Sequence, residues 1–266
     1  MKIGWIGLGG IGVEMVKRLR AADFPVTVYT RGKGLEEAKA AGAGTCDSYT
    51  ALAAQSEVLC TCVFNDAQLR DVMFNEGVLA ALQPGAIVAN HTTGSPDLNR
   101  EIGAHAPKGV EVLDATFSGG PMDVTAGRLT IMAGGAAEAL ERAKPALQTY
   151  ASRIFHTGPL GSGQMIKLLN NLSFAANIMN AAEILRLADK QGLNIQAVAE
   201  MIQASSGASY SMNVFKASPA PSFALTGARH YMEKDVAVAM ASATDSGLDV
   251  SHFQIVADYF KPAAKS

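Results

Sequence analysis

Two patterns of hydrophobic and polar positions divide the chain. Up to about residue 158, short apolar runs alternate with segments in which apolar residues recur at helical spacing. Such runs are typical of buried parallel strands, and the periodic segments are typical of helices that cover a sheet. This alternation predicts a doubly wound α/β sheet. The expected strands lie at residues 2–7, 26–29, 57–64, 86–89, 110–115, 129–133 and 153–156.

Beyond residue 158 the pattern indicates helices only. The longest begins near Gly161 and runs to Gln191, because no Gly or Pro interrupts residues 164–191. Apolar residues around most of its circumference predict a buried helix. We expect a doubly wound domain at residues 1–160 and an all-α domain at residues 161–266, which begins with this long interdomain helix. Shorter helices are predicted at residues 195–204, 210–215, 232–246 and 251–259.

The composition narrows the class of protein. Of 266 residues 48% are hydrophobic, and the net charge of -2 gives no electrostatic reason to expect a nucleic acid or an anionic membrane as partner. Cys46, Cys60 and Cys62 are odd in number and lack metal-ligand spacing, so we expect reduced thiols, no metal site and a cytoplasmic location. Neither a signal peptide nor an apolar run long enough to cross a bilayer is expected.

The clearest chemical signal is a glycine-rich turn between the first strand and the first helix. Gly7 permits the tight turn, Gly9 lets the backbone approach a pyrophosphate, and Gly12 lets helix and strand pack closely. The N-terminus of the helix would face the phosphates. In this place the pattern predicts a Rossmann-type dinucleotide site rather than a turn that binds nothing. Its predicted residues are Gly7, Leu8, Gly9, Gly10, Ile11 and Gly12.

The end of the second predicted strand bears on the choice of cofactor. An acidic residue there would bind the ribose hydroxyls of NAD, but the sequence has Thr30, Arg31 and Lys33. A guanidinium group suits a phosphate dianion. We therefore expect NADP as cofactor, with NAD less favoured. The alternative is that Arg31 and Lys33 are ordinary surface charges.

A lysine and an asparagine share one face of the long helix. Lys167 and Asn171 are four residues apart, in a segment that is otherwise mostly apolar. A buried ammonium is costly unless it has a partner or a function. The alternative is an ordinary helix lysine whose ammonium reaches solvent.

Four motifs in order give the chain its resemblance to the β-hydroxyacid dehydrogenase family, which includes 3-hydroxyisobutyrate dehydrogenase and tartronate semialdehyde reductase. Residues 7–15 resemble the family's GLGxMGxxM opening, with Ile11 in place of Met. Residues 114–120 resemble its DAPVSGG loop, with Thr116 for Pro and Phe117 for Val. Residues 161–171 match its GxGxxxKLxNN stretch, and residues 234–235 match its lysine–aspartate pair.

This resemblance implies specific roles for individual residues. Lys167 would be the catalytic acid/base, and Asn171 would hold the substrate. Ser118, Gly119 and Gly120 would bind a substrate carboxylate, since backbone N–H groups in such a turn form an anion nest. The cofactor would contact Phe64, Thr93 and Lys234, with Val63 at the same strand end as Phe64. The implied function is NADP-dependent interconversion of a small 3-hydroxy acid and its semialdehyde or keto form.

Two other functions fit the same scaffold. One is an imine reductase, and the other is a nucleotide-binding module without catalysis. The presence of both Lys167 and Asn171 favours alcohol chemistry over either alternative. Of the remaining candidates, His91 is expected to be a packed, neutral residue. Asp123 fits a turn cap and a substrate contact equally well.

Apolar residues of the all-α half are more numerous than a few helices can bury. We therefore expect a homodimer or a homotetramer. The residues that suggest this are Met201, Ile202, Phe215, Phe223, Leu225, Phe253 and Phe260.

Overall fold

The computed structural model describes residues 1–217, 221–245, 247 and 249–261, with residues 221–231 described by their backbone only. Internal contacts divide the chain into two compact units. Unit 1 is Met1–Lys167 and unit 2 is Leu168–Ser266. The division falls inside the long helix, later than residue 160, because the first turn of that helix is bonded to the sheet of unit 1.

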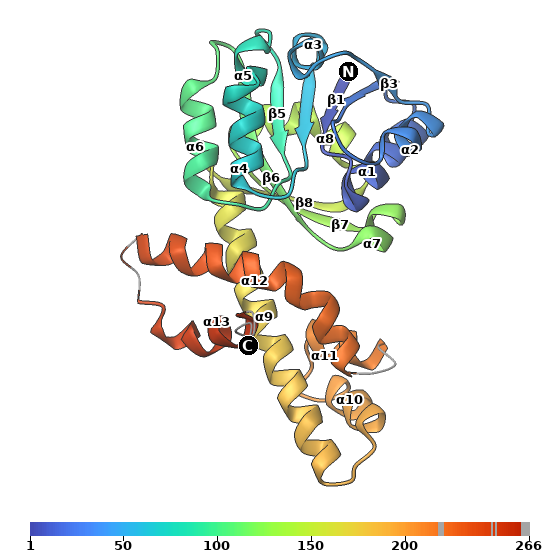
Figure 1. Cartoon of the computed structure of the whole chain (residues 1–266), viewed down its shortest axis with the longest axis vertical. Helices are drawn as coiled ribbons and strands as arrows, with labels where there is room; N and C mark the ends of the chain where they lie inside the picture. The colour runs from blue at the N-terminus through green and yellow to red at the C-terminus, as the bar shows by residue number, and fades with distance from the viewer. Residues whose placement is uncertain (218–220, 246, 248, 262–266) are drawn as a thin grey trace. The chain divides into compact units, whose positions relative to one another are not determined.

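Unit 1 contains one eight-stranded sheet with the strand order β3-β2-β1-β4-β5-β6-β7-β8 (Figure 1). The chain moves outward from β1 to β3 and then crosses to β4 on the other side of β1, which is the topological switch of a Rossmann sheet. Strands β1 to β6 are parallel, β7 is antiparallel to β6, and β8 is parallel to β7. The strands are β1 (Ile3–Ile6), β2 (Val26–Tyr29), β3 (Gly44–Thr45), β4 (Val58–Thr61), β5 (Ile87–Asn90), β6 (Glu111–Ser118), β7 (Leu129–Gly134) and β8 (Ala151–Gly158).

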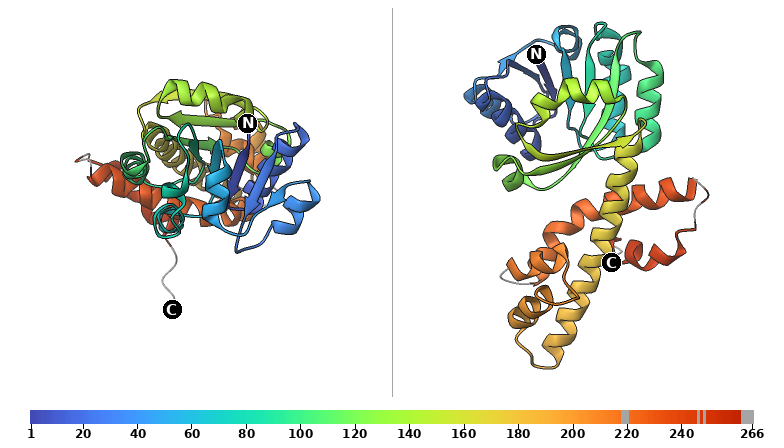
Figure 2. Two further views of the ribbon diagram at one scale, coloured as in Figure 1. Left: turned by 90° about the horizontal axis from the view of Figure 1, so that it is seen from above. Right: turned by 180° about the vertical axis from the view of Figure 1, so that it is seen from behind.

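Helices cover both faces of this sheet. Figure 2 shows helices on either side of the sheet. Helices α1 and α8 supply side chains to one core cluster, and α3 to α6 supply them to the other. The predicted doubly wound α/β fold is therefore confirmed. The helical elements of unit 1 are α1 (Gly10–Ala21), α2 (Leu35–Ala40), α3 (Tyr49–Gln55), α4 (Asp66–Arg70), the π-helix η1 (Asp71–Asn75), α5 (Val78–Ala81), α6 (Pro96–His105), α7 (Pro121–Thr125) and α8 (Ala137–Leu147).

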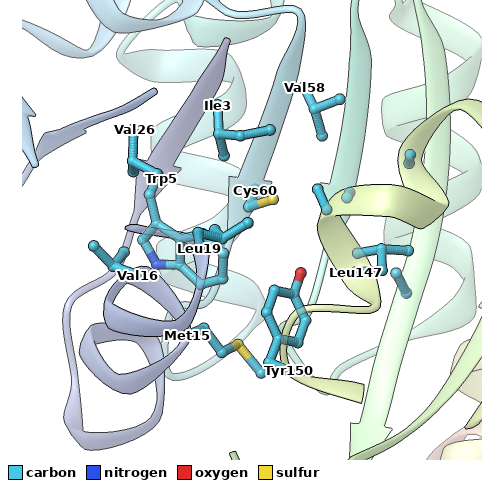
Figure 3. Close-up of a cluster of buried hydrophobic side chains, with 14 of the residues drawn as sticks. Ile3, Trp5, Met15, Val16, Leu19, Val26, Val58, Cys60, Leu147 and Tyr150 are labelled. Carbon is cyan, nitrogen blue, oxygen red and sulfur yellow. The ribbon is translucent and has the colours of Figure 1, made fainter. Parts of the chain in front are cut away.

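A group of aromatic rings lies in the mainly aliphatic core between the sheet and α1 and α8. Trp5 and Tyr150 are completely buried there (Figure 3). His91 stacks on Trp5 at 5.6 Å between ring centroids, and its Nδ1 lies 2.6 Å from the carbonyl oxygen of Ala115. Because a carbonyl only accepts, Nδ1 carries the proton and Nε2 accepts from the Tyr150 hydroxyl at 3.0 Å. Burial lowers the pKa of His91 to about 4, which confirms the prediction of a packed, neutral histidine.

The described part of unit 2 is entirely helical. The elements are α9 (Ser162–Lys190, which begins in unit 1), α10 (Ile195–Gln203), α11 (Tyr210–Ala217), α12 (Pro221–Asp245), the 3-10 turn η2 (Ser251–Phe253) and α13 (Gln254–Phe260). Leu172 and Ile178 of α9 are buried against residues of α11 to α13. On the rest of its surface α9 leaves Ile166, Leu169, Ile184 and Leu187 exposed by 41%, 58%, 45% and 52%. The prediction of a helix buried all round is therefore wrong for the single chain.

Several local predictions need correction. Asp66 resembles an N-cap in the sequence, but the N-cap of α4 is Asn65, whose side chain accepts from the Gln68 N–H. The helix predicted to start at residue 232 begins at Pro221.

Of the apolar residues expected at an interface, Phe215 and Phe260 lie in the core of unit 2. The side chains of Phe223 and Leu225 lie outside the described residues. Short elements such as β3, α5 and α7 were missed because they are too brief to show a periodic pattern.

Among the described helices, none is both long and apolar enough to cross a membrane. The described residues also include no group of three His, Cys, Asp or Glu side chains that could hold a metal ion.

Candidate functional site

The N-terminus of α1 is shaped by glycines that tolerate no side chain. Gly7 has a φ of 96°, and a Cβ on it would lie 2.2 Å from the Cys62 carbonyl oxygen. A Cβ on Gly12 would lie 2.0 Å from the carbonyl oxygen of Gly7. Both positions therefore require glycine for packing, as the motif predicts.

The same N-terminus is open toward a ligand. Nothing lies within 4 Å of a Cβ built on Gly9 or Gly10. Gly9 is the N-cap and provides no side-chain hydrogen bond, and the first turn of α1 contains no acidic residue. The first N–H groups of the helix and its positive dipole end are thus left for an anion. This arrangement fits the pyrophosphate of a dinucleotide, held by the backbone of Gly9, Gly10 and Ile11.

The predicted phosphate-binding cations lie in the exposed loop after β2. The Arg31 guanidinium lies 2.5 Å from a carboxylate oxygen of Glu76 and 5.2 Å from the centre of the Tyr49 ring. The hydrogen bond to Glu76 raises the pKa of Arg31. Thr30 uses its hydroxyl to accept from the N–H of Gly32 at 3.0 Å. Glu76 follows η1 and is too far along the chain for the sequence pattern to indicate this pairing.

A buried polar network holds the loops that follow β4 and β5. Asn90 accepts from the Thr61 hydroxyl at 2.9 Å and from the Thr92 N–H at 3.0 Å. The Thr92 hydroxyl in turn accepts from the N–H of Val63 at 3.1 Å. The network ties together the loops that carry the predicted cofactor contacts, Val63 and Phe64 in one and Thr93 in the other. Phe64 is 46% exposed.

The Ser-Gly-Gly turn after β6 is partly occupied by its own neighbour. Gly119 has a φ of 128°, which requires glycine, and a Cβ on Gly120 would meet nothing within 4 Å. The Gly120 N–H donates to Asp123 at 3.0 Å, and Asp123 also pairs with Arg128 at 3.2 Å. Asp123, the third residue of α7, therefore caps the start of that helix by accepting the N–H of its N-cap residue, Gly120. The N–H of Gly120 already has an acceptor, so an anion nest in this turn would depend on its other groups.

The first turn of α9 is fastened to the sheet by a buried carboxylate. Asp114 at 0% exposure accepts the N–H of Gly161 at 2.9 Å and that of Gln164 at 2.6 Å. Burial raises the pKa of Asp114, and these hydrogen bonds oppose that shift. A Cβ on Gly163 would lie 2.4 Å from the backbone oxygen of Asp114, so this glycine permits close packing. The Thr116 hydroxyl donates to the Gly163 carbonyl at 3.1 Å.

Gln164 connects this turn to the loop after β5. Its Oε1 accepts from the Gly94 N–H at 3.0 Å, and its Nε2 donates to the Thr92 carbonyl at 2.6 Å. Lys167 follows three residues later on the same helix and is half-buried. Gln164, three residues before the predicted acid/base, therefore ties the first turn of α9 to the loop that contains Thr93.

A second polar cluster lies within unit 2. Asn171 is 3% exposed and donates to a carboxylate oxygen of Asp235 at 2.6 Å. The other oxygen of Asp235 lies 3.3 Å from the Lys234 ammonium. Asp235 thus pairs with Lys234, its neighbour in the lysine–aspartate motif, and also fixes the carboxamide of Asn171. Sequence reasoning missed this second contact, as it missed those of Asp114 and Gln164.

Comparison with protein families accounts for almost the whole chain. Residues 2–158 match the family described as the NAD binding domain of 6-phosphogluconate dehydrogenase. Residues 161–266 match the family described as "NAD-binding of NADP-dependent 3-hydroxyisobutyrate dehydrogenase".

Individual relatives agree with these matches. The chain is 34% identical over 246 residues to a probable 3-hydroxyisobutyrate dehydrogenase-like protein of Arabidopsis thaliana, covering 91% of this chain and 82% of the relative. It is 32% identical over 256 residues to the NAD-dependent L-serine dehydrogenase of Pseudomonas aeruginosa, covering 92% and 86%. The structure of 3-hydroxyisobutyrate dehydrogenase of Mycobacterium tuberculosis with L-serine superimposes with a TM-score of 0.88 at 29% identity, covering 97% of this chain and 92% of that one.

Proposed function

The chain belongs to the β-hydroxyacid dehydrogenase family, and from that premise we propose that it interconverts a small 3-hydroxy acid and its semialdehyde or keto form, with NADP as cofactor and Lys167 as acid/base. The observation that carries the proposal is that Gln164, three residues before Lys167 on α9, is hydrogen-bonded to the loop after β5. That loop follows β5 and the open N-terminus of α1 follows β1, and one strand, β4, lies between β1 and β5 in the sheet.

In this proposal some residues of unit 1 bind the cofactor, and Lys167 transfers the proton. Gly7 to Gly12 hold the pyrophosphate, and Val63, Phe64 and Thr93 contact the nicotinamide half of the cofactor. A bound nicotinamide would supply the hydride acceptor for the carbinol carbon in oxidation and the hydride donor in reduction. The hydroxyl proton passes to the Lys167 amine in oxidation and returns from the ammonium in reduction.

Substrate positioning falls to the turn after β6 and to Asn171. We assign the carboxylate of the substrate to the Ser118 hydroxyl and the Gly119 N–H. The N–H of Gly120 is already bonded to Asp123, so Gly120 does not donate to the carboxylate. Its role is to leave space for the carboxylate, since it has no side chain and nothing lies within 4 Å of a Cβ built on it. Asn171 holds the substrate without adding charge, and Asp235 keeps its carboxamide in place. Lys234 contacts the cofactor. The substrate class is a carboxylate with a nearby hydroxyl, a feature shared by the 3-hydroxyisobutyrate and L-serine named for the relatives.

The preference for NADP rests on Thr30, Arg31 and Lys33. No acidic residue follows β2 where a ribose-binding carboxylate would sit, and two cations lie there instead. The 2′-phosphate of NADP would replace Glu76 as the partner of Arg31. Changing Thr30→Asp together with Arg31→Leu should move the ratio of kcat/KM for the two cofactors toward NAD. Equal kcat/KM for NADH and NADPH in the parent enzyme would contradict this preference.

The decisive test of the function is turnover of Lys167→Ala. We expect kcat to fall on the order of a hundredfold or more, with NADPH affinity almost unchanged. Lys167→Arg should not restore activity, since guanidinium stays protonated. Asn171→Ala should raise KM and lower kcat together. Lys190→Ala, at the exposed far end of α9, is the matched control and should behave like the parent.

The substrate panel must separate this reaction from its alternatives. Semialdehydes, 3-hydroxy acids and cyclic imines are assayed with both cofactors in the parent and in Lys167→Ala. Turnover of imines that survives Lys167→Ala would favour an imine reductase. Binding of NADPH without turnover of any of these compounds would favour a nucleotide-binding module.

We also infer a homodimer or homotetramer. Ile184 and Leu187 on α9 and Met201 on α10 are exposed by 45%, 52% and 66% in the single chain. Apolar helical surface of this kind marks an interface. A monomeric mass by light scattering at micromolar concentration would contradict this inference.

A further inference from the structure

The side chain of Gln164 lies completely inside unit 1 and uses both ends of its carboxamide. It is 0% exposed, and both of its partners are backbone atoms of one loop, the Gly94 N–H and the Thr92 carbonyl. A carboxamide that donates and accepts at the same time can satisfy both partners in one orientation only. Gln164 therefore fixes the distance and the rotation between α9 and this loop.

Three other hydrogen bonds of the same turn lead to strand β6. Asp114 accepts from the backbone of Gly161 and Gln164, and Thr116 donates to Gly163; both residues belong to β6. These contacts fasten α9 to the strand before the predicted carboxylate-binding turn. The Gln164 carboxamide fastens it to the loop of Thr93, a predicted cofactor contact. One attachment uses strand β6, and the other uses the loop after β5.

We propose that Gln164 is a positioning residue for proton transfer. It holds the Lys167 amine at a fixed position relative to the loop after β5, residues 92–94, which contains the predicted cofactor contact Thr93. This inference rests on the proposed function, because it assigns to Gln164 a role that acts through Lys167. Gln164 and Lys167 lie three residues apart, so they are neighbours on the helix surface. A displacement of about 1 Å in a reacting group can cost about a hundredfold in rate.

The main test is Gln164→Met, which keeps the length of the side chain and removes both hydrogen bonds. We expect kcat to fall at least about tenfold, with the dissociation constant for NADPH changed by less than about threefold, because the phosphates are held by Gly7 to Gly12. Ser56→Ala is the matched control, since it also removes one buried side-chain hydrogen bond, from Ser56 to Leu52, on α3. It should lower the melting temperature and leave kcat unchanged. Equal effects of the two variants on kcat would overturn the proposal.

A second variant, Gln164→Glu, tests the positioning role of Gln164 through the pH dependence of kcat. In Gln164→Glu the protonated carboxyl can still accept from Gly94 and donate to Thr92, whereas the carboxylate cannot donate. The kcat of this variant relative to the parent should therefore rise as the pH falls, with both proteins verified as folded by circular dichroism. A ratio that is constant, or that rises with pH, would overturn the proposal. The second result would instead indicate a direct effect of the new charge on Lys167.

Lys167→Ala separates the failure of this inference from the failure of the proposed function. If Lys167→Ala is inactive and Gln164→Met has parental kcat, the function stands and the role of Gln164 is wrong. If Lys167→Ala keeps parental turnover, the acid/base assignment itself is wrong, and so is the role of Gln164 that depends on it.

Discussion

Helices α1 and α9 begin in opposite ways, although each N-terminus offers the same unsatisfied N–H groups. The N-cap of α1 is Gly9, which has no side-chain hydrogen bond and open space around it. The start of α9 is covered by Asp114, which accepts the N–H of Gly161 just before the helix and that of Gln164 in its first turn, and Gly163 packs closely against β6. The N-terminus of α1 is open to an external anion, whereas N–H groups at the start of α9 already donate to the carboxylate of Asp114.

The difference between the two N-termini corresponds to two roles: α1 can bind a ligand at its N-terminus, and α9 holds its own residues in position. A bare N-terminus keeps its dipole and donors for a ligand, and the chain forgoes the stability of a cap. A capped N-terminus cannot bind a ligand there, but it holds the residues that follow in a fixed position. Lys167 lies in the second turn of the capped helix, where a fixed position matters for proton transfer.

The largest expected effect comes from breaking the cap of α9 with Asp114→Asn. One of the two acceptor oxygens becomes an NH2 group, which then faces an N–H donor of Gly161 or Gln164. Because both donors are buried, we expect a loss of about 3 kcal/mol in the free energy of unfolding, measured by urea denaturation. The kcat should fall as well, since the Lys167 turn loses its attachment.

Asp97→Asn is the control for that variant. Asp97 lies in the first turn of α6 with its side chain 79% exposed, so the same change of charge should alter stability by less than about 0.5 kcal/mol. A similar loss in both variants would mean that the buried cap of α9 has no special importance.

The second effect comes from giving α1 the cap that it lacks. Gly9 has a φ of -68° and a ψ of 179°, a conformation that aspartate adopts easily. In Gly9→Asp the carboxylate would accept the N–H groups of α1 and repel the pyrophosphate, so NADPH affinity should fall on the order of a hundredfold through the loss of two charge-assisted hydrogen bonds. The melting temperature should stay the same or rise slightly, because the new residue caps the helix.

Gly9→Ala distinguishes charge from bulk in this experiment. It adds a Cβ without a carboxylate, so its loss of NADPH affinity, measured by fluorescence titration, should be clearly smaller than that of Gly9→Asp. If both variants bind NADPH as tightly as the parent, the open N-terminus of α1 is not the phosphate site.

The smallest effect is expected from Thr116→Val, which tests how much the Thr116 hydroxyl contributes to the attachment of α9. Thr116→Val keeps the shape of the side chain and removes the hydroxyl that donates to the Gly163 carbonyl. We expect a loss of about 1 kcal/mol in the free energy of unfolding and little change in NADPH affinity. A loss as large as that of Asp114→Asn would mean that the hydroxyl, and not the carboxylate, is the main attachment.

Features that depend on neighbouring residues could be predicted from the sequence. The glycine turn after β1 was predicted because strand, turn and helix follow one another directly, and the requirement for glycine at Gly7 and Gly12 comes from contacts within that short segment or with the next strand. The length of α9 followed from an uninterrupted run without Gly or Pro, which ends close to Lys190. The doubly wound sheet followed from the alternation of strands and helices.

Features that depend on distant residues were decided only by the tertiary structure. Asp114 caps α9 from 47 residues upstream of Gly161, and Gln164 bonds to Thr92 across 72 residues. The pairing of Arg31 with Glu76 and the packing of Phe215 and Phe260 into the core of unit 2 were equally invisible. A local pattern reports the period and the polarity of a segment, whereas a hydrogen bond or a buried contact depends on which segments the fold brings together.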